Sequence, residues 1–433
     1  MNGPAWRSSG VVLALGCVLV LATAWQADAR ASAPLPRRAL WMETSANLRT
    51  LSSREAIRAV VARARATGID TLIPEAKNAW GFVIYESDIA PHIRTVPVPL
   101  AGSPAPSTWY PQDFDALAIL IEEAHAAGLQ VHAAVNVFGE GLVVTPGARL
   151  VGTLERHPEW MSVHLRAATD GRAAFVPSFA AGPIAFANPA HPEAQLYELA
   201  VLWEVVSRYH VDGIVLDRAR YAGLDSDFSA LSRAQFETFT GRPVADWPHD
   251  VLQPHGRGPR PGPRFPEWVA WRASVIRAYV RAAGRLVRRV RPGLPVAMYV
   301  GAWYPVAFEV GQNWARPDAP PLFAAWSPAW SQASLLPDLD YLIVGLYDRT
   351  VTRWQALQRR QPLWRSVVGG ALLSRDLTEG TPLLGGIWFA LHRGNRAAGA
   401  GAVRAAVRIA DGLMAFDLSD VQAGDWWGIL GVR

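Results

Sequence analysis

Short apolar runs recur along the whole chain, and most of them alternate with segments that have helical periodicity. Eight of these runs are predicted to be strands. Nearly every position in them is apolar, which is typical of strands covered on both faces. Strands that alternate with helices pair in parallel. The predicted strands are residues 39–42, 71–74, 129–137, 213–217, 295–300, 341–346, 366–372 and 413–416.

The segments between the strands carry signals for the starts and ends of helices. Ser53 can cap a helix over residues 54–66 that ends before Gly68, and Pro192 suits the first turn of the next long helix. The alternation predicts an α/β fold, specifically a closed (β/α)8 TIM barrel, with a doubly wound open sheet as the alternative. No Gly-rich phosphate loop follows the first strand, which disfavours a dinucleotide-binding fold. The other predicted helices are residues 113–127, 192–209, 229–239, 266–290, 353–360 and 396–410.

The first residues resemble an export signal. Arg7 supplies a positive charge, residues 11–24 form an apolar run, and Ala27 and Ala29 are the small residues that a signal peptidase reads. We therefore expect a signal peptide over residues 1–29 and a periplasmic or secreted protein.

Cleavage at that point leaves a single catalytic domain over residues 30–433 and removes Cys17, the one cysteine of the chain, so the mature protein forms no disulfide. Lipid attachment at Cys17 is the less favoured alternative. The apolar run around it is too short to predict a membrane span that persists after cleavage.

Composition narrows the choice of partner. The net charge is only +5 and the arginines are spread along the chain, so no nucleic-acid partner is predicted. The 19 tryptophans include Trp303, Trp326 and Trp330, and flat indoles stack on sugar rings, which favours a polysaccharide. No HExxH motif, Cys/His cluster or EF-hand spacing is present, so neither a metal nor another cofactor is predicted.

Polar side chains recur at the C-terminal ends of the predicted strands. In TIM barrels this end carries the chemistry, because its loops vary while the barrel stays constant. Two long connections, residues 141–190 and 222–262, also leave from it. The polar and aromatic residues expected there are Glu43, Asn47, Glu75, Lys77, Asn78, Asn136, Glu140, Asp217, Arg218, Arg220, Tyr221, Tyr299, Trp303, Tyr347, Asp348 and Asp417.

The stretch VDGIVLDRARY, residues 211–221, contains the strongest candidate. Asp217 ends an apolar strand, which places a carboxylate in a partly dry setting. Burial raises the pKa of a carboxyl group and a neighbouring arginine lowers it, so Arg218 and Arg220 can tune or orient Asp217. We expect Asp217 to be catalytic, with a structural ion pair as the alternative.

Several other candidates have simpler structural interpretations. Glu75 and Lys77 can pair with each other across the barrel end, and His132 is expected to be a core histidine. Asp225 and Asp227 are expected to be turn and helix-cap residues rather than metal ligands.

Four segments together resemble the Glycosyl hydrolase-like 10 family of bacterial barrel proteins. They are RALWMETSANL, YPQDFDALAILIEEAHAAGLQVHAAVNVF, VDGIVLDRARY and LDYLIVGLYD, and the resemblance spans residues 37–416. It implies a glycoside hydrolase acting on a bacterial amino-sugar glycan, either peptidoglycan strands or a related exopolysaccharide. Many relatives have a second aspartate where this chain has Arg218, which bears on the substrate more than on the reaction.

Glycoside hydrolysis commonly uses two carboxyl groups, one protonated and one ionised. Asp217 is the expected first member, and Asp348 is slightly favoured over Glu75 as the second, with the loop residue Glu140 behind them. A substrate 2-acetamido group can replace the second carboxyl group. A non-catalytic carbohydrate-binding barrel, a lyase and a deacetylase are the competing functions. The expected substrate-binding residues are Asn136, Arg218, Arg220, Tyr221, Lys77, Tyr299, Trp303 and Tyr347.

Overall fold

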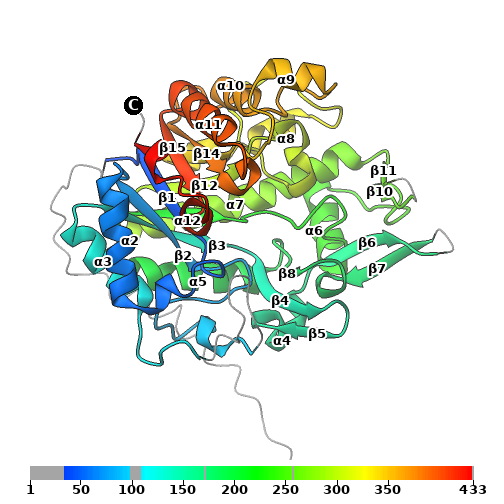
Figure 1. The fold of residues 1–433 in the computed structure, drawn as a ribbon. Helices are drawn as coiled ribbons and strands as arrows, with labels where there is room; N and C mark the ends of the chain where they lie inside the picture. The colour runs from blue at the N-terminus through cyan, green and yellow to red at the C-terminus, as the bar shows by residue number, and fades with distance from the viewer. Residues whose placement is uncertain (1–33, 98–108, 170–171, 256–257, 432–433) are drawn as a thin grey trace, which may run out of the picture.

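Eight parallel strands close into a barrel with the neighbour order β1-β15-β14-β13-β12-β9-β3-β2, and helices surround it (Figure 1). The computed structural model describes residues 34–97, 109–169, 172–255 and 258–431, so the expected signal peptide and Cys17 lie outside the described residues. The closed order confirms the TIM barrel and rules out the open sheet. The barrel strands are β1 Arg38–Met42, β2 Thr71–Lys77, β3 Gln130–Asn136, β9 Gly213–Asp217, β12 Val296–Gly301, β13 Tyr341–Gly345, β14 Leu383–Trp388 and β15 Gly412–Phe416.

Helix capping follows the sequence closely. The Ser53 side chain accepts a hydrogen bond from the Ala56 amide at 3.3 Å and starts α2 where predicted. Asp115 caps α3 through the Ala118 amide at 2.8 Å, so this helix begins later than predicted. The helices are α2 Arg54–Ala66, α3 Ala116–Ala126, α4 Thr153–Arg156, α5 Pro192–Arg208, α6 Ala230–Thr240, α7 Phe265–Val290, α8 Pro328–Gln332, α9 Arg353–Gln358, α10 Val367–Leu377, α11 Arg396–Ile409, α12 Leu418–Ala423 and α13 Trp427–Leu430.

The prediction of the seventh strand over residues 366–372 is wrong, because that segment begins helix α10. Ser366 caps the helix by accepting from the Gly369 amide at 3.1 Å. An apolar run of this length is compatible with either a strand or a buried helix, and the cap decides between them. The true strand, β14, follows the helix and contains Gly385 and Gly386, which weaken a strand pattern in the sequence.

The barrel interior is filled by side chains from alternate positions of the strands, as the two-residue period of a strand requires. At the N-terminal end of this core, His132 Nδ1 lies 2.8 Å from the Tyr341 hydroxyl, and burial lowers the pKa of His132 to about 4. The prediction of a core histidine is therefore confirmed. The interior layers are Ala39, Trp41, Ile73, Ala134, Val215, Ala297, Tyr341, Ile343, Leu384 and Met414.

Two excursions leave the C-terminal ends of β3 and β9 and lie together on the right in Figure 1. Asp227 accepts from the Ser229 amide at 3.1 Å in the turn before α6, as expected of a turn residue. The excursion strands are β4 Gly139–Thr145, β5 Arg149–Val151, β6 Val163–Ala167, β7 Ala173–Pro177, β8 Ile184–Phe186, β10 Leu252–Gln253 and β11 Arg260–Pro261.

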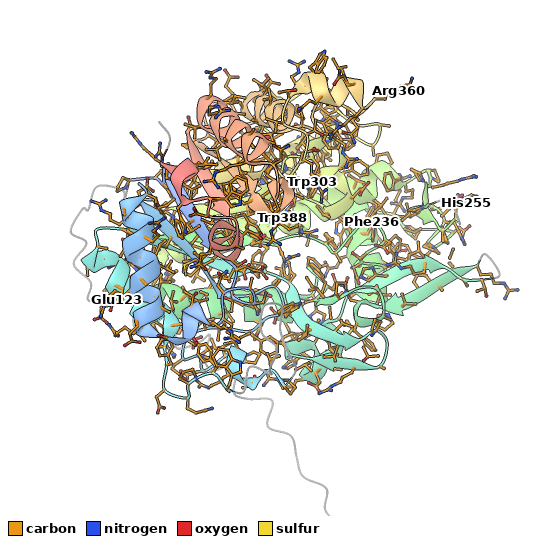
Figure 2. All side chains as sticks on the ribbon, viewed as in Figure 1. Glu123, Phe236, His255, Trp303, Arg360 and Trp388 are labelled. Atoms are coloured by element: carbon orange, nitrogen blue, oxygen red, sulfur yellow. The ribbon has the colours of Figure 1, made fainter. Side chains whose placement is uncertain are left out.

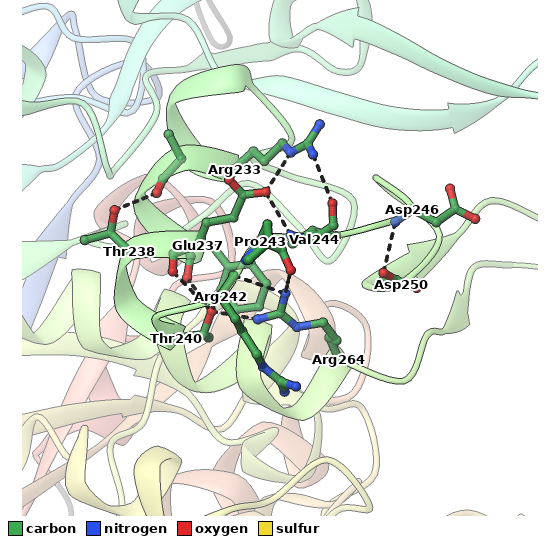
Figure 3. A network of polar contacts seen from close by, with 12 residues as sticks. Arg233, Glu237, Thr238, Thr240, Arg242, Pro243, Val244, Asp246, Asp250 and Arg264 are labelled. Carbon is green, nitrogen blue, oxygen red and sulfur yellow. Dashed lines mark hydrogen bonds and ion pairs between the residues drawn. The ribbon is translucent and has the colours of Figure 1, made fainter.

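A polar network fixes the second excursion to the start of α7 (Figure 3). Arg264 donates to the Thr240 hydroxyl at 2.6 Å and to the Pro243 carbonyl at 2.8 Å. Glu237 accepts from the Val244 amide at 2.9 Å. These bonds satisfy the polar groups at the C-terminal end of α6, so the excursion is a folded part of the domain.

Candidate active site

The C-terminal ends of the eight barrel strands form one rim, and four carboxyl groups gather at it. Glu43 follows β1, Glu75 lies in β2, Asp217 ends β9 and Asp417 follows β15. We call these four residues the rim cluster. Because β1 pairs with both β2 and β15, three of them come from adjacent strands.

Glu75 is a buried member of the rim cluster, with only 4% of its surface exposed. Ile73 faces the barrel interior, so Glu75, two residues further along β2, faces it too. Its carboxylate accepts from Trp41 Nε1 at 3.4 Å, the Thr44 amide at 3.1 Å and Asn136 Nδ2 at 3.3 Å. Burial raises the pKa of Glu75 well above its usual range, and the negative charges of Glu43 and Asp217 raise it further.

Asp217 is partly exposed and lies on the same interior face, two residues beyond Val215. Its Oδ1 atom accepts from the Arg218 amide at 2.7 Å. Burial raises the pKa of Asp217, whereas the positive charges of Arg218 and Arg220 oppose that rise. Arg218 has a φ of +53°, in the left-handed region that a non-glycine residue seldom adopts. The chain therefore turns sharply directly after the carboxylate.

Asn136 links the two central carboxyl groups. Its backbone is the register partner of Asp217 across β3 and β9, and its side chain donates to Glu75 on β2. Glu75 and Asp217 thus occupy strands on either side of β3, roughly 10 Å apart in strand spacing. Asn136 is fully buried and also donates to the Lys77 carbonyl at 3.0 Å, so its side-chain amide is bound to β2, and its expected substrate contact stays a prediction.

The other two members of the rim cluster have their own polar partners. The Ser45 hydroxyl donates to Glu43. Asp417 accepts from Asn47 Nδ2 at 2.5 Å and from the Ser419 hydroxyl at 2.7 Å. Burial raises the pKa of both carboxyl groups. The sequence placed Glu43 and Asp417 at the rim without assigning either a role.

Aromatic rings form the rest of the rim, and we call Trp41, Tyr299, Tyr347, Trp388 and Phe416 the aromatic wall. The Tyr347 ring lies 5.8 Å from Tyr299, 5.7 Å from Trp388 and 5.5 Å from Phe416, and Tyr299 lies 6.0 Å from Trp41. All except Trp41 are partly exposed. Sequence reasoning missed Trp388 because it misplaced the seventh strand, and an aromatic residue at the end of an apolar run was the available signal.

Trp303 lies beyond the end of β12, with its indole folded back over Gly301, where a β-carbon would collide with the ring. It is partly exposed, and Figure 2 shows it and Trp388 near the centre of the view. Its position agrees with the expected stacking surface, although its sugar contact stays a prediction.

Lys77 points away from the rim, contrary to its predicted substrate-binding role. The β2–β3 register shifts between Glu75 and Lys77, and such a bulge turns the next side chain to the opposite face. Lys77 is fully buried between the barrel and α5, where it pairs with Glu198 at 2.6 Å and with Glu140. The alternative pairing of Lys77 with Glu75 is wrong for the same reason.

Tyr221 is also turned away from the rim. It is fully buried, with the Arg272 guanidinium 4.3 Å from its ring centroid, so it packs against α7 instead of contacting substrate. Arg220 is partly exposed and lies 5.9 Å from the Phe186 ring of β8. Burial lowers the pKa of Arg220 to about 10.

Asp348, the favoured second carboxyl group, makes its contacts outside the rim cluster. Its Oδ1 accepts from the Thr350 amide at 2.7 Å, and its charge acts on His392. No described contact joins it to Asp217 or Glu75. The structure therefore brings Glu75, Asn136, Asp217 and Arg218 together, and leaves Asp348 in a turn beside them.

Within the described residues, no group of three or more His, Cys, Asp or Glu side chains is arranged to hold a metal ion. None of the described helices is both long and apolar enough to span a membrane.

A closed parallel barrel with carboxyl groups and aromatic rings at its C-terminal rim defines the class: a TIM-barrel protein with a polar, aromatic-lined rim. The family follows from comparison. The model of the Glycosyl hydrolase-like 10 family matches residues 36–368, and the chain belongs to that family.

Three similar proteins extend this assignment. The chain is 27% identical over 329 residues to an S-layer-related protein of Niallia circulans, covering 72% of this chain and 20% of that protein. It is 23% identical to glycosyl hydrolase DigH of Escherichia coli K12, covering 70% of this chain and 60% of DigH. The chain therefore spans less than two thirds of these relatives. The glycoside hydrolase domain of PgaB (BpsB) from Bordetella bronchiseptica has the same fold, with a TM-score of 0.57, 12% identity, and coverage of 92% of this chain and 100% of that domain.

Proposed function

We propose that this protein is an exported glycoside hydrolase that cleaves glycosidic bonds in a bacterial amino-sugar glycan, either peptidoglycan strands or a related exopolysaccharide. The observation that carries the proposal is the pair Glu75 and Asp217, on the strands either side of Asn136 and at the same rim as the aromatic wall. The substrate class rests on the family and on the motifs around the third and fourth strands.

The electrostatics of the site favour a protonated Glu75 and an ionised Asp217. Burial and the negative charges of Glu43 and Asp217 disfavour ionisation of Glu75, whereas Arg218 and Arg220 favour the ionised form of Asp217. Glu75 then holds the proton. In this assignment, Glu75 protonates the glycosidic oxygen as the bond to the anomeric carbon breaks.

The Asp217 carboxylate stabilises the positive charge that develops on the sugar ring. It does so as a nucleophile, as a base for water, or by orienting a 2-acetamido group that attacks the anomeric carbon. In each case water supplies the hydroxyl group of the product. Arg218, Arg220, Tyr299 and Tyr347 bind sugar hydroxyls, and Trp303 stacks on a ring.

Asp348 is replaced by Glu75 in this proposal because of its contacts. Its carboxylate is held by the turn at Thr350, whereas the charge of Asp217 acts on Glu75, whose carboxylate Asn136 orients. Export to the periplasm or beyond rests on the signal-like segment and is part of the proposal.

The test is mass spectrometry of the products formed by residues 30–433 from denuded peptidoglycan, a deacetylated glucosamine polymer and a galactosamine polymer. A hydrolase gives shortened chains with one water added per cleaved bond. Asp217→Asn should abolish cleavage, and Asp318→Asn, at an exposed ion pair, is the matched control that should not.

Three outcomes contradict the proposal. Binding of a polymer without cleavage by the wild type indicates a non-catalytic carbohydrate-binding barrel. Unsaturated products that absorb in the ultraviolet indicate a lyase, and loss of acetyl groups without chain cleavage indicates a deacetylase.

A further inference from the structure

Helix α9 presents an apolar face to solvent. Trp354 is 65% exposed and Leu357 is 61% exposed, the two largest values among the exposed large apolar residues described. They are three residues apart and so lie on one side of the helix, roughly opposite Ala356, its buried residue. An apolar pair that points away from the core does not contribute to the folding of this chain.

Hydrogen bonds at both ends of α9 fix the position of the exposed pair. Thr352 and Gln355 form a reciprocal capping box that fixes the start of α9. Arg359, just after the helix, donates to the Thr350 hydroxyl at 2.8 Å. Helix α9 follows the C-terminal end of β13, and it is therefore part of the loop structure at the rim of the barrel (Figure 1).

The charged residues along the segment that contains α9 have one sign. Residues 349–365 contain five arginines and no aspartate or glutamate. All five are exposed, and none forms an ion pair with a described residue; Figure 2 shows Arg360 at the outer edge of the molecule. Many other surface arginines are paired, as Arg58 is with Glu123. The five arginines are Arg349, Arg353, Arg359, Arg360 and Arg365.

We propose that this face, defined by Trp354, Leu357 and the five arginines, docks the protein onto an anionic phospholipid surface. Tryptophan partitions to the membrane interface, leucine enters the acyl region, and guanidinium groups bind lipid phosphates. A soluble polyanion would engage the arginines but would leave Leu357 in water. Because α9 belongs to the rim, docking holds the catalytic end of the barrel next to the lipid surface.

The experiment measures co-sedimentation of the folded protein with phosphatidylglycerol–phosphatidylcholine vesicles and with pure phosphatidylcholine vesicles. Binding is expected only to the first kind, and it should weaken with added salt because exposed charges are screened. The double variant Trp354→Ala/Leu357→Ala should lower the partition coefficient about tenfold. Phe239→Ala/Leu196→Ala, which removes exposed apolar side chains from other faces, is the matched control and should bind normally.

A second pair of variants tests the charge. Arg353→Gln/Arg360→Gln/Arg365→Gln should also lower binding at least about tenfold. Arg289→Gln/Arg404→Gln/Arg408→Gln, at exposed positions of α7 and α11, carries the same charge loss and should not. Thermal melting of every variant checks folding, and Leu357→Gln provides a milder version of the apolar change.

Absence of any preference for anionic vesicles overturns the proposal, as does an equal loss in the matched controls. Loss of binding in the arginine variant but not in Trp354→Ala/Leu357→Ala overturns it as well, and indicates a soluble polyanion. Cleavage of a soluble glycan should be unchanged in Trp354→Ala/Leu357→Ala, so docking and hydrolysis fail or succeed independently.

Discussion

Strand β2 carries two buried charged side chains two residues apart, Glu75 and Lys77. They lie in clusters that differ in how their charges are compensated. Lys77 lies among Glu140 and Glu198, so a cation is in direct contact with both acids. Glu75 lies near Glu43 and Asp217, and no described lysine or arginine forms a direct ion pair with it. The first cluster holds its cation in direct contact, whereas in the second Arg218 and Arg220 act on the carboxyl groups without a direct ion pair to Glu75.

The difference separates a structural role from a catalytic one. A buried charge with its partner in place is stable and needs no ligand. A cluster of like charges raises the pKa values of its members and leaves them ready to bind protons or a positively charged transition state. On this comparison, changes in the Lys77 cluster should affect folding, and changes in the rim cluster should affect turnover.

Asp217→Asn should have the largest effect. The amide removes the negative charge that faces the sugar while preserving the side-chain shape, so kcat should fall about 10³- to 10⁴-fold. Turnover of the glycan identified by product analysis measures this, and denaturant unfolding of the same variant should show little loss of stability. If the variant is less stable but the folded protein keeps its specific activity, Asp217 belongs among the structural charges.

Lys77→Met should have the largest effect on stability. It leaves two buried carboxyl groups without their cation, which costs about 3–5 kcal/mol of the free energy of unfolding. Urea denaturation measures the loss. Arg58→Met, which breaks a surface pair with Glu123, is the control and should cost far less, because exposed ion pairs are screened by solvent.

Adding Glu140→Gln and Glu198→Gln to Lys77→Met should recover part of the lost stability, because no uncompensated charge then remains buried. Failure to recover any of it would mean that Lys77 acts by packing alone.

The bulge that separates Glu75 from Lys77 also marks the limit of what the sequence predicts. Ser53 was recognised as a local cap, and most predicted helices lie within a few residues of the observed ones. Ser366 also caps a helix, but the apolar run after it was interpreted as a strand. The alternation of eight strands and helices predicted the barrel. Which face of β2 each side chain after Glu75 occupies depends on how β2 pairs with β3. No local sequence pattern predicts that pairing.

The same reason explains the mixed outcome at the rim. Asp217 and Asn136 end regular strands, so their direction follows from the two-residue period. Asp348 and Tyr221 lie beyond strand ends, where the turn decides the direction, and the structure turns them to Thr350 and Arg272. The proximity of Glu75 to Asp217 requires β3 to pair with both β2 and β9, which are far apart in the sequence.

Glu75→Gln should lower kcat about 10²-fold by removing the proposed proton donor. Its effect on stability should depend on pH. The pKa of Glu75 is raised in the folded state, so the folded protein holds this proton more tightly than the unfolded chain does. That stabilisation is present at acidic pH and is lost as the pH rises through the folded-state pKa.

Glutamine mimics the protonated form, and the variant should therefore match the wild type in acid and become the more stable of the two as the pH rises. Denaturation of both proteins across the pH range measures the difference. A stability difference that does not change with pH would mean that Glu75 is not titrating in the folded protein.

Trp388→Ala should have the smallest effect on turnover, and it should change substrate binding selectively. Its Nε1 donates to Asp420 Oδ2 at 2.9 Å, which holds the indole in the aromatic wall without any contact to the rim carboxyl groups. Loss of a stacking surface worth about 1 kcal/mol should raise KM about fivefold and leave kcat nearly unchanged. Steady-state kinetics on a soluble glycan separate the two constants, with Trp354→Ala as the exposed control. A fall in kcat at constant KM would contradict a binding role, since it would mean that the wall acts on the carboxyl pair rather than on the sugar.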